Sequence, residues 1–221
     1  MSIAANVEAL RARIPAGVTL VAVSKTQPAG AIREAHAAGQ RDFGENYAQE
    51  WKAKADALAD LTDLRWHFVG SLQTNKVRVL AGRVAFVHAV DRLELARELG
   101  KRFTAAGGTV RAFLEVNTGG EETKGGCRPE EAPALAAEIA RVPGLSLVGL
   151  MVIPPPDDDP VPHFRRLRAL RDRIGLAELS MGMSGDWERA IAEGATFVRV
   201  GTAIFGPRPA KAGTGGPLTP P

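Results

Sequence analysis

Apolar residues recur along this chain at two spacings, one typical of helices and one typical of strands. Between Ile3 and Ile14 they lie three or four positions apart, which predicts an amphipathic helix that ends at Pro15. The β-branched run at 18–24 then predicts a strand, and a helical pattern follows over 29–38. Short apolar runs and helical patterns continue to alternate in this way to about residue 201.

The alternation predicts an α/β fold with eight strands, at 18–24, 41–46, 66–70, 84–90, 110–117, 145–152, 177–182 and 196–201. Helical patterns separate them, at 29–38, 47–59, 76–80, 91–103, 129–139, 164–174 and 184–194. Strands separated by helices pair in parallel, because each helix returns the chain to the start of the next strand. Eight such units in about 180 residues indicate a single (β/α)8 TIM barrel with an extra N-terminal helix. A doubly wound open sheet is the alternative.

The chain length agrees with one domain. A chain of 221 residues that is 45% hydrophobic and 24% charged can bury a sizeable core. We place the barrel at residues 1–206. Residues 207–221 contain five prolines and three glycines, and this composition predicts a disordered tail.

Composition indicates which kinds of partner and which cellular compartment to expect. Cys127 is the single cysteine, which excludes an intramolecular disulfide framework. No apolar run approaches the roughly 18 residues of a membrane span, and the N-terminus lacks the pattern of a secretory signal, so we expect a cytoplasmic protein without a membrane partner. The 28 Lys and Arg residues are interspersed with 25 Asp and Glu residues, and only 5% of residues are aromatic. We therefore expect no nucleic-acid partner.

Polar residues that directly follow the predicted strands are the candidates for chemistry, because functional residues of such barrels lie where the strands end. Lys25 directly follows the first strand. A partly desolvated lysine amine at that position would be available to attack an aldehyde. The other interpretation is an ordinary lysine whose ammonium reaches solvent, and the local sequence alone favours it.

Two segments near the end of the predicted barrel, MGMSGD and FVRVGTAIFG, could hold a phosphate group. The short helix after the seventh strand would offer free N–H groups at its start, and Ser184 would add a hydroxyl. Gly201 and Thr202 would contribute further N–H groups and a second hydroxyl, as loops after strands seven and eight often do in this fold. The alternative is that Ser184 is a helix N-cap and Gly201 a tight turn.

Arg199 lies inside a predicted core strand, where a charged side chain needs a partner or a ligand. It shares a strand face with Phe197, whereas the neighbouring valines point to the other side. The guanidinium could face the nitrogen of a bound heteroaromatic ring. A structural pair with a buried carboxylate is the other interpretation, and the residues alone favour it.

Other titratable residues give weaker signals. Glu115 is a candidate inward-facing acid. His67 and His88 lie in predicted strands without further residues at metal-ligand spacing, so we interpret them as packing residues and expect no metal site. The acidic run at 157–159 is more typical of a solvated turn.

Seven motifs resemble one known family: AVSKTQP, FGENY, WHFVGSLQTNK, FLEVNTGGEETKGG, LVGLMVIP, LSMGMSGDWERAI and FVRVGTAIFG. The family is that of the pyridoxal 5′-phosphate (PLP) homeostasis proteins, which are similar to the N-terminal barrel domain of alanine racemase. The motifs stand in the expected order, and the resemblance extends from about residue 3 to Arg208.

The resemblance implies PLP as the cofactor, held as a Schiff base on Lys25. It implies that the phosphate is held by three residues, Ser184, Gly201 and Thr202. Arg199 would face the pyridine nitrogen, as the matching arginine does in alanine racemase. The remaining pocket residues would be Asn46 and Met183.

The function that we expect is that of a PLP carrier in intracellular vitamin B6 and amino-acid homeostasis, without substantial turnover and without catalytic residues. An arginine at the pyridine nitrogen disfavours the protonated ring that makes PLP a strong electron sink. Racemisation also needs a second base, for which Tyr47 and Cys127 are the candidates, whereas racemases take theirs from a C-terminal β domain. The chain after the barrel contains only the tail.

Three other functions remain open: a PLP-dependent amino-acid racemase, a Schiff-base aldolase and a purely protein-binding module. The expected partners are PLP and, as recipients of it, PLP-dependent apoenzymes. We expect a monomer.

Overall fold

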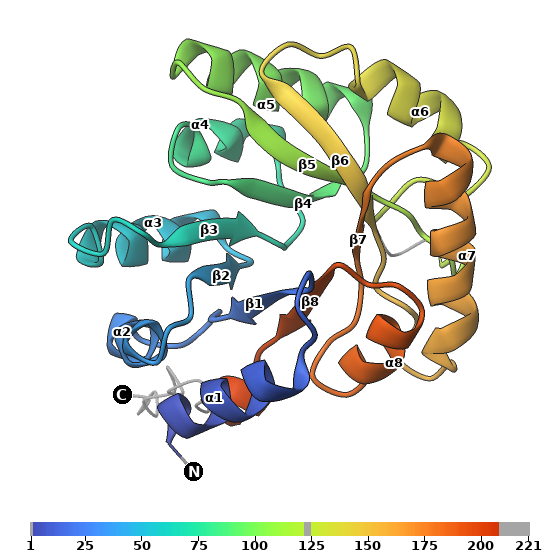
Figure 1. The fold of residues 1–221 in the computed structure, drawn as a ribbon. Coiled ribbons are helices and arrows are strands. Elements are labelled where there is room, and N and C mark those ends of the chain that lie inside the picture. Colours follow the sequence, from blue (N-terminus) through green and yellow to red (C-terminus); the bar gives the residue numbers. More distant parts are fainter. Residues whose placement is uncertain (1, 122–124, 208–221) are drawn as a thin grey trace, which may run out of the picture.

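The computed structural model describes residues 2–121 and 125–207, which form a closed barrel of eight parallel strands in chain order (Figure 1). The last strand pairs with the first, from Thr19 opposite Phe197 to Ala22 opposite Val200. This pairing confirms the (β/α)8 barrel and excludes the open sheet. The predicted tail at 207–221 lies outside the described residues except for Pro207.

All eight predicted strands are present, most of them slightly shorter than predicted: β1 (Thr19–Val23), β2 (Asp42–Glu45), β3 (Arg65–Phe68), β4 (Phe86–Val90), β5 (Val110–Glu115), β6 (Leu145–Met151), β7 (Glu178–Ser180) and β8 (Phe197–Val200). The α-helices are α1 (Ile3–Arg13), α2 (Ala29–Ala37), α3 (Ala48–Ala57), α4 (Val77–Leu80), α5 (Leu93–Ala105), α6 (Ala132–Ile139), α7 (Pro160–Ile174), α8 (Trp187–Ala192) and α9 (Thr202–Phe205).

Three helices differ most from the prediction. α7 begins at Pro160, four residues before the predicted start, because Asp159 caps it and a proline fits its first turn. The pattern at 76–80 corresponds to a 3-10 turn at Thr74–Lys76 followed by the single turn of α4. The sequence analysis also missed α9, because a four-residue helix offers too few positions for a periodic pattern.

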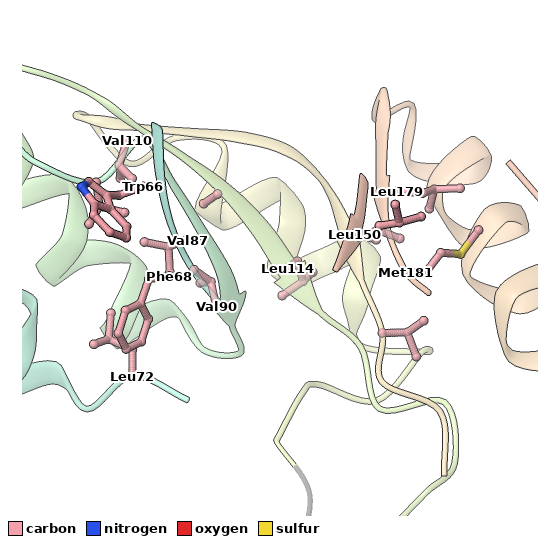
Figure 2. Packing of buried hydrophobic residues seen from close by; sticks show 14 of the residues in the cluster. Trp66, Phe68, Leu72, Val87, Val90, Val110, Leu114, Leu150, Leu179 and Met181 are labelled. Carbon is pink, nitrogen blue, oxygen red and sulfur yellow. The ribbon is translucent and has the colours of Figure 1, made fainter. Parts of the chain in front are cut away.

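Strand alternation separates two apolar regions. Outward-facing residues such as Val87, Leu114 and Leu150 pack beneath the helices in the large core (Figure 2). Inward-facing residues fill the barrel lumen with a smaller cluster, which contains Val21, Phe86, Ala89, Phe113, Met151 and Phe197. The lumen is therefore a packed core, and the open space for a ligand lies at one end of it.

The N-terminal helix α1 completes the outer ring of helices between α8 and α2 (Figure 1). Arg13 pairs with Glu188 of α8, and its guanidinium lies 5.0 Å from the ring centre of Trp187. Asn6 donates from Nδ2 to the carbonyl oxygen of Ile204 in α9 at 2.9 Å. Because α9 is only one turn long, α1 covers the junction of β8 and β1 that a longer final helix would cover.

We predict that Gly149→Ala destabilises the barrel. A Cβ at Gly149 in β6 would lie 2.1 Å from the carbonyl oxygen of Glu178 in β7, so the two strands would have to separate. The expected loss in the free energy of unfolding is about 3 kcal/mol, measured by urea unfolding. The matched control is Gly30→Ala in α2, where a Cβ meets nothing within 4 Å. It should stabilise the fold by about 0.5–1 kcal/mol, and equal midpoints for the two variants would contradict the prediction.

Candidate functional site

A cavity of about 290 Å³ opens at the carboxyl ends of the strands, and all seven predicted site residues line it: Lys25, Asn46, Met183, Ser184, Arg199, Gly201 and Thr202. Arg199 lies in β8 and Thr202 begins α9, and the other five lie in the segments that directly follow β1, β2, β7 and β8. The structure thus brings together positions that are up to 177 residues apart in the chain, from Lys25 to Thr202.

Five residues that the sequence analysis did not select also line the cavity: Val23, Val69, Ile153, Gly185 and Gly206. Strand alternation could have identified Val23, because it precedes Lys25 by two positions and shares its face. Ile153 and Met183 are 39% and 38% exposed, so both contribute apolar side chains at the mouth of the cavity.

A buried ion cluster behind β1 anchors the backbone on both sides of Lys25. Lys54 of α3 donates from Nζ to the carbonyl oxygen of Ser24, to Glu45 and to Glu50, each at 2.6 Å. The Glu50 carboxylate also accepts the backbone N–H of Thr26. Because the residues before and after Lys25 are both held, the position of the lysine Cα is well determined.

Two features at this cluster cost folding free energy: a buried carboxylate oxygen of Glu45 and the backbone conformation of Thr26. Glu45 is fully buried, and one of its carboxylate oxygens, Oε2, has no hydrogen-bond partner among the described residues. Burial raises the pKa of Glu45, although the charge of Lys54 opposes the shift. Thr26 adopts the left-handed conformation with φ of 64°, which costs energy in a β-branched residue. Both features lie beside Lys25, so the backbone there is held in position although these two features lower the stability of the fold.

Ser184 joins the two loops that border the predicted phosphate position. Its Oγ accepts the backbone N–H of Gly201 at 3.2 Å. The helix α8 begins only at Trp187, with Asp186 at its N-cap. The alternative assignment of Ser184 as the helix N-cap is therefore wrong, and its hydroxyl proton can be donated toward the cavity.

Arg199 is 5% exposed and borders the cavity from the lumen side. It donates from Nη1 to Ser180 Oγ at 2.6 Å and from Nη2 to the carbonyl oxygen of Val152 at 2.9 Å. Burial lowers the pKa of Arg199 to about 10, with Glu115 and Asp186 opposing the shift, so the guanidinium is charged at neutral pH. Both partners are uncharged groups, which differs from the carboxylate pair that the residues alone favoured.

Three other candidates lie outside the lining of the cavity. Glu115 is buried, as expected for an inward-facing acid, and burial together with the charge of Asp91 raises its pKa to about 7. Burial raises the pKa of the Cys127 thiol to about 12, so the thiol is unreactive near neutral pH. Tyr47 is 58% exposed.

His67 and His88 are fully buried, and the sequence analysis missed that they contact each other. His67 Nδ1 lies 3.0 Å from His88 Nε2, and further hydrogen bonds connect the pair to Asp42 and Ser180. These contacts join four different strands, so no local sequence signal reports them. Within residues 2–121 and 125–207, no group of three His, Cys, Asp or Glu side chains could hold a metal ion.

We predict that Lys54→Met lowers the free energy of unfolding by about 3–5 kcal/mol, because it leaves Glu45 buried without its counter-charge. Chemical denaturation measures the loss, and the double variant Glu45→Gln/Lys54→Met should recover most of it. Lys52→Met is the control, since Lys52 lies in the same helix with an exposed side chain and should change stability by less than about 0.5 kcal/mol. A loss of equal size in both lysine variants would refute the role of the cluster.

We predict a pH signature for Glu115→Gln. The raised pKa means that the folded state holds a proton that the unfolded state releases, so this group's contribution to stability falls as pH rises from 4.5 to 7. The slope is at most about 1.4 kcal/mol per pH unit. The stability of wild type relative to Glu115→Gln should decline over that range, measured by urea unfolding at a series of pH values. A difference that is independent of pH would show that the carboxyl has its ordinary pKa.

Comparison with known sequences places the chain among close relatives. A family model described as the alanine racemase N-terminal domain matches residues 1–209. A pyridoxal phosphate homeostasis protein of Pseudomonas aeruginosa is 48% identical over 222 residues, which cover 94% of this chain and 96% of that protein. Proteins of the same name from Aquifex aeolicus and Escherichia coli are 48% and 44% identical, and cover 86% and 89% of this chain.

Solved structures agree with this placement. PipY of Synechococcus elongatus, described with PLP bound, is 40% identical and superposes with a TM-score of 0.88 over 93% of this chain and 100% of its own. Alanine racemase of Corynebacterium glutamicum is 19% identical with a TM-score of 0.72, over 95% of this chain and 62% of its own, which shows a shared fold. The chain belongs to the pyridoxal phosphate homeostasis protein family, within the larger group that shares the alanine racemase N-terminal domain.

Proposed function

We propose that this protein binds PLP as a Schiff base on Lys25 and acts as an intracellular PLP carrier in vitamin B6 and amino-acid homeostasis, without substantial turnover. The observation that carries the proposal is the convergence of three kinds of group on one cavity. A lysine amine lies at the end of β1, hydroxyl and N–H groups lie in the loops after β7 and β8, and a buried arginine lies between them.

The residues present fit PLP. An aldehyde needs an amine, for which Lys25 is the candidate. A phosphate needs donors, and the hydroxyls of Ser184 and Thr202 are the candidates, beside Gly201, whose own N–H donates to Ser184 Oγ. Asn46 supplies an independent sign of a missing ligand, because its Oδ1 is buried without a hydrogen-bond partner among the described residues. Such an orphaned acceptor in a cavity is accounted for when a bound molecule donates to it.

Two features support carriage over turnover, and the weaker is the environment of Arg199, because the resemblance gives alanine racemase the same arginine. PLP supplies an electron sink for carbanion chemistry, most strongly when its ring nitrogen is protonated. A charged guanidinium opposite that nitrogen disfavours the second positive charge. The two candidates for a second base are also poorly suited, because the thiol of Cys127 is buried with a raised pKa and Tyr47 does not line the cavity.

The relatives support the same function. Several carry the name pyridoxal phosphate homeostasis protein, and PipY is described with PLP bound. No helix in the described part of the chain is long and apolar enough to cross a bilayer. We place the carrier in the cytoplasm as a monomer, with PLP-dependent apoenzymes as recipients of its cofactor. Size-exclusion chromatography, and transfer of PLP to an added apoenzyme, test these two points.

We predict that the protein loaded with PLP shows the visible absorbance band of a lysine-bound cofactor. Borohydride reduction followed by peptide mass mapping should place the label on Lys25. Lys25→Ala should lose the band, and Lys52→Ala, which removes an exposed lysine, should keep it. Ser184→Ala should weaken PLP retention by about tenfold, the effect of one charge-assisted hydrogen bond. Full occupancy with an unchanged band in Lys25→Ala would refute the assignment.

The racemase alternative is tested with the same sample. Incubation of the loaded protein with L- or D-alanine should give neither rapid racemisation nor transamination. Turnover that disappears in Lys25→Ala would make the protein an enzyme. An aldolase would instead form its imine with substrate and have no visible band without added cofactor, and a protein-binding module would not retain PLP.

A further inference from the structure

A chain of hydrogen bonds crosses the barrel lumen from Arg199 to the opposite end of the barrel. Arg199 donates to Ser180 Oγ at 2.6 Å, and Ser180 Oγ lies 2.8 Å from His88 Nδ1. His88 Nε2 lies 3.0 Å from His67 Nδ1, and His67 Nε2 lies 3.0 Å from Asp42 Oδ1. Five side chains from β8, β7, β4, β3 and β2 therefore form one continuous path.

The charges at the two ends of this path, with neutral rings between them, determine where the protons lie. An arginine can only donate, so Ser180 Oγ accepts from Arg199, and the Ser180 hydroxyl proton is available to His88. Asp42 at the other end can only accept, since hydrogen bonds from Arg65 and His67 outweigh its burial and lower its pKa to about 2. His67 therefore carries its proton on Nε2 and accepts at Nδ1.

The proton positions on the two histidines are consistent with the donor at one end of the path and the acceptor at the other. Because His67 accepts at Nδ1, His88 carries its proton on Nε2, which leaves His88 Nδ1 to accept from Ser180. Burial lowers the pKa of both histidines, and for His88 the proximity of His67 and the charge of Arg199 lower the pKa further. Both rings are thus neutral, and every hydrogen bond in the path points from Arg199 toward Asp42.

Packing holds the two rings in the planes that this order requires. The ring of His67 stacks on Phe86 with a centroid distance of 4.5 Å, and that of His88 stacks on Phe113 at the same distance. Asp42 is held in turn by Arg65, which donates from Nε at 2.8 Å and from Nη2 at 2.6 Å. The path is rigid along its length and anchored at its far end.

We propose that Ser180, His88 and His67 are positioning residues for Arg199, which hold its guanidinium at the floor of the cavity and connect it to the negative charge of Asp42. The proposal rests on the proposed function for its purpose, because Arg199 would face the ring of bound PLP. The geometry of the path itself is independent of PLP. Among the described residues, the hydrogen bonds of this buried guanidinium go to uncharged groups, so its orientation depends on how firmly those groups are held.

The first test uses the protein without PLP. Nitrogen NMR should show both buried histidines as neutral Nε2–H tautomers that do not titrate near neutral pH. Exchange of the Arg199 side-chain N–H protons should be slow in wild type and about three- to tenfold faster in His88→Phe and Ser180→Ala, the range expected for one lost hydrogen bond. His88→Gln retains one donor and one acceptor and should restore part of the protection.

The second test uses the loaded protein. PLP should dissociate about three- to tenfold faster from His88→Phe and Ser180→Ala, and the pH dependence of its absorbance should shift. Leu99→Ala is the control, because Leu99 is a buried residue of α5 in the outer core and lies on none of the strands that carry the path. It should lower thermal stability but change neither the absorbance nor the release rate. Arg199→Gln should alter both.

The outcomes separate the two proposals. Wild-type exchange and release rates in Ser180→Ala, beside a clear effect of Arg199→Gln on release, would overturn the positioning role even if His88→Phe fails to fold. A wild-type protein that shows the expected tautomers and protected Arg199 protons but does not retain PLP would overturn the proposed function and leave the positioning of Arg199 established.

Discussion

The pairing of the last strand with the first is the constraint on which the candidate site depends. Closure aligns Val21 of β1 with Arg199 of β8, and Ala22 with Val200. Parallel strands in this register end side by side, so the residues that follow β1 and β8 meet at the same rim. An open sheet of the same elements would leave Lys25 and Arg199 on strands that are not neighbours. Lys25, Arg199 and the polar residues that follow β7 and β8 line one cavity only because the sheet closes.

Closure also buries polar side chains in the lumen, where the hydrogen-bond path from Arg199 to Asp42 gives them partners. Inward-facing side chains in an eight-stranded barrel have no contact with solvent in the middle of the lumen, so each polar group there needs a protein partner. The inner cluster of this barrel combines aromatic rings with two histidines, a serine and an arginine. The rings provide the packing, and the polar groups satisfy one another in sequence. The two arrangements support each other, because the stacked rings hold the histidines in the planes that the hydrogen bonds require.

Periodicity predicted the fold because each strand and helix is encoded locally. The strands alternate with helices often enough that only parallel topologies remain, and eight units favour a closed barrel. Residues directly after strands, such as Lys25 and Asn46, could be selected for the same reason. The partners of Arg199 could not be predicted, because Ser180 and Val152 are ordinary residues that acquire their role from strand register. Asp42 and His67 are likewise 25 positions apart, and nothing between them indicates that they meet. The turn of α9 was too short to produce a pattern.

The position of α1 has a consequence for how the chain folds during synthesis. Residues of this first helix contact Trp187 and Glu188 in α8 and Ile204 in α9, so its partners are among the last to leave the ribosome. Until then the part of α1 that faces α8 and α9 is uncovered, and β1 lacks its neighbour β8. Contacts of such large sequence separation slow folding and prolong the exposure of apolar surface. A nascent chain that stalls before β8 would therefore present an unpaired strand edge beside an uncovered helix, which is the kind of surface that molecular chaperones bind.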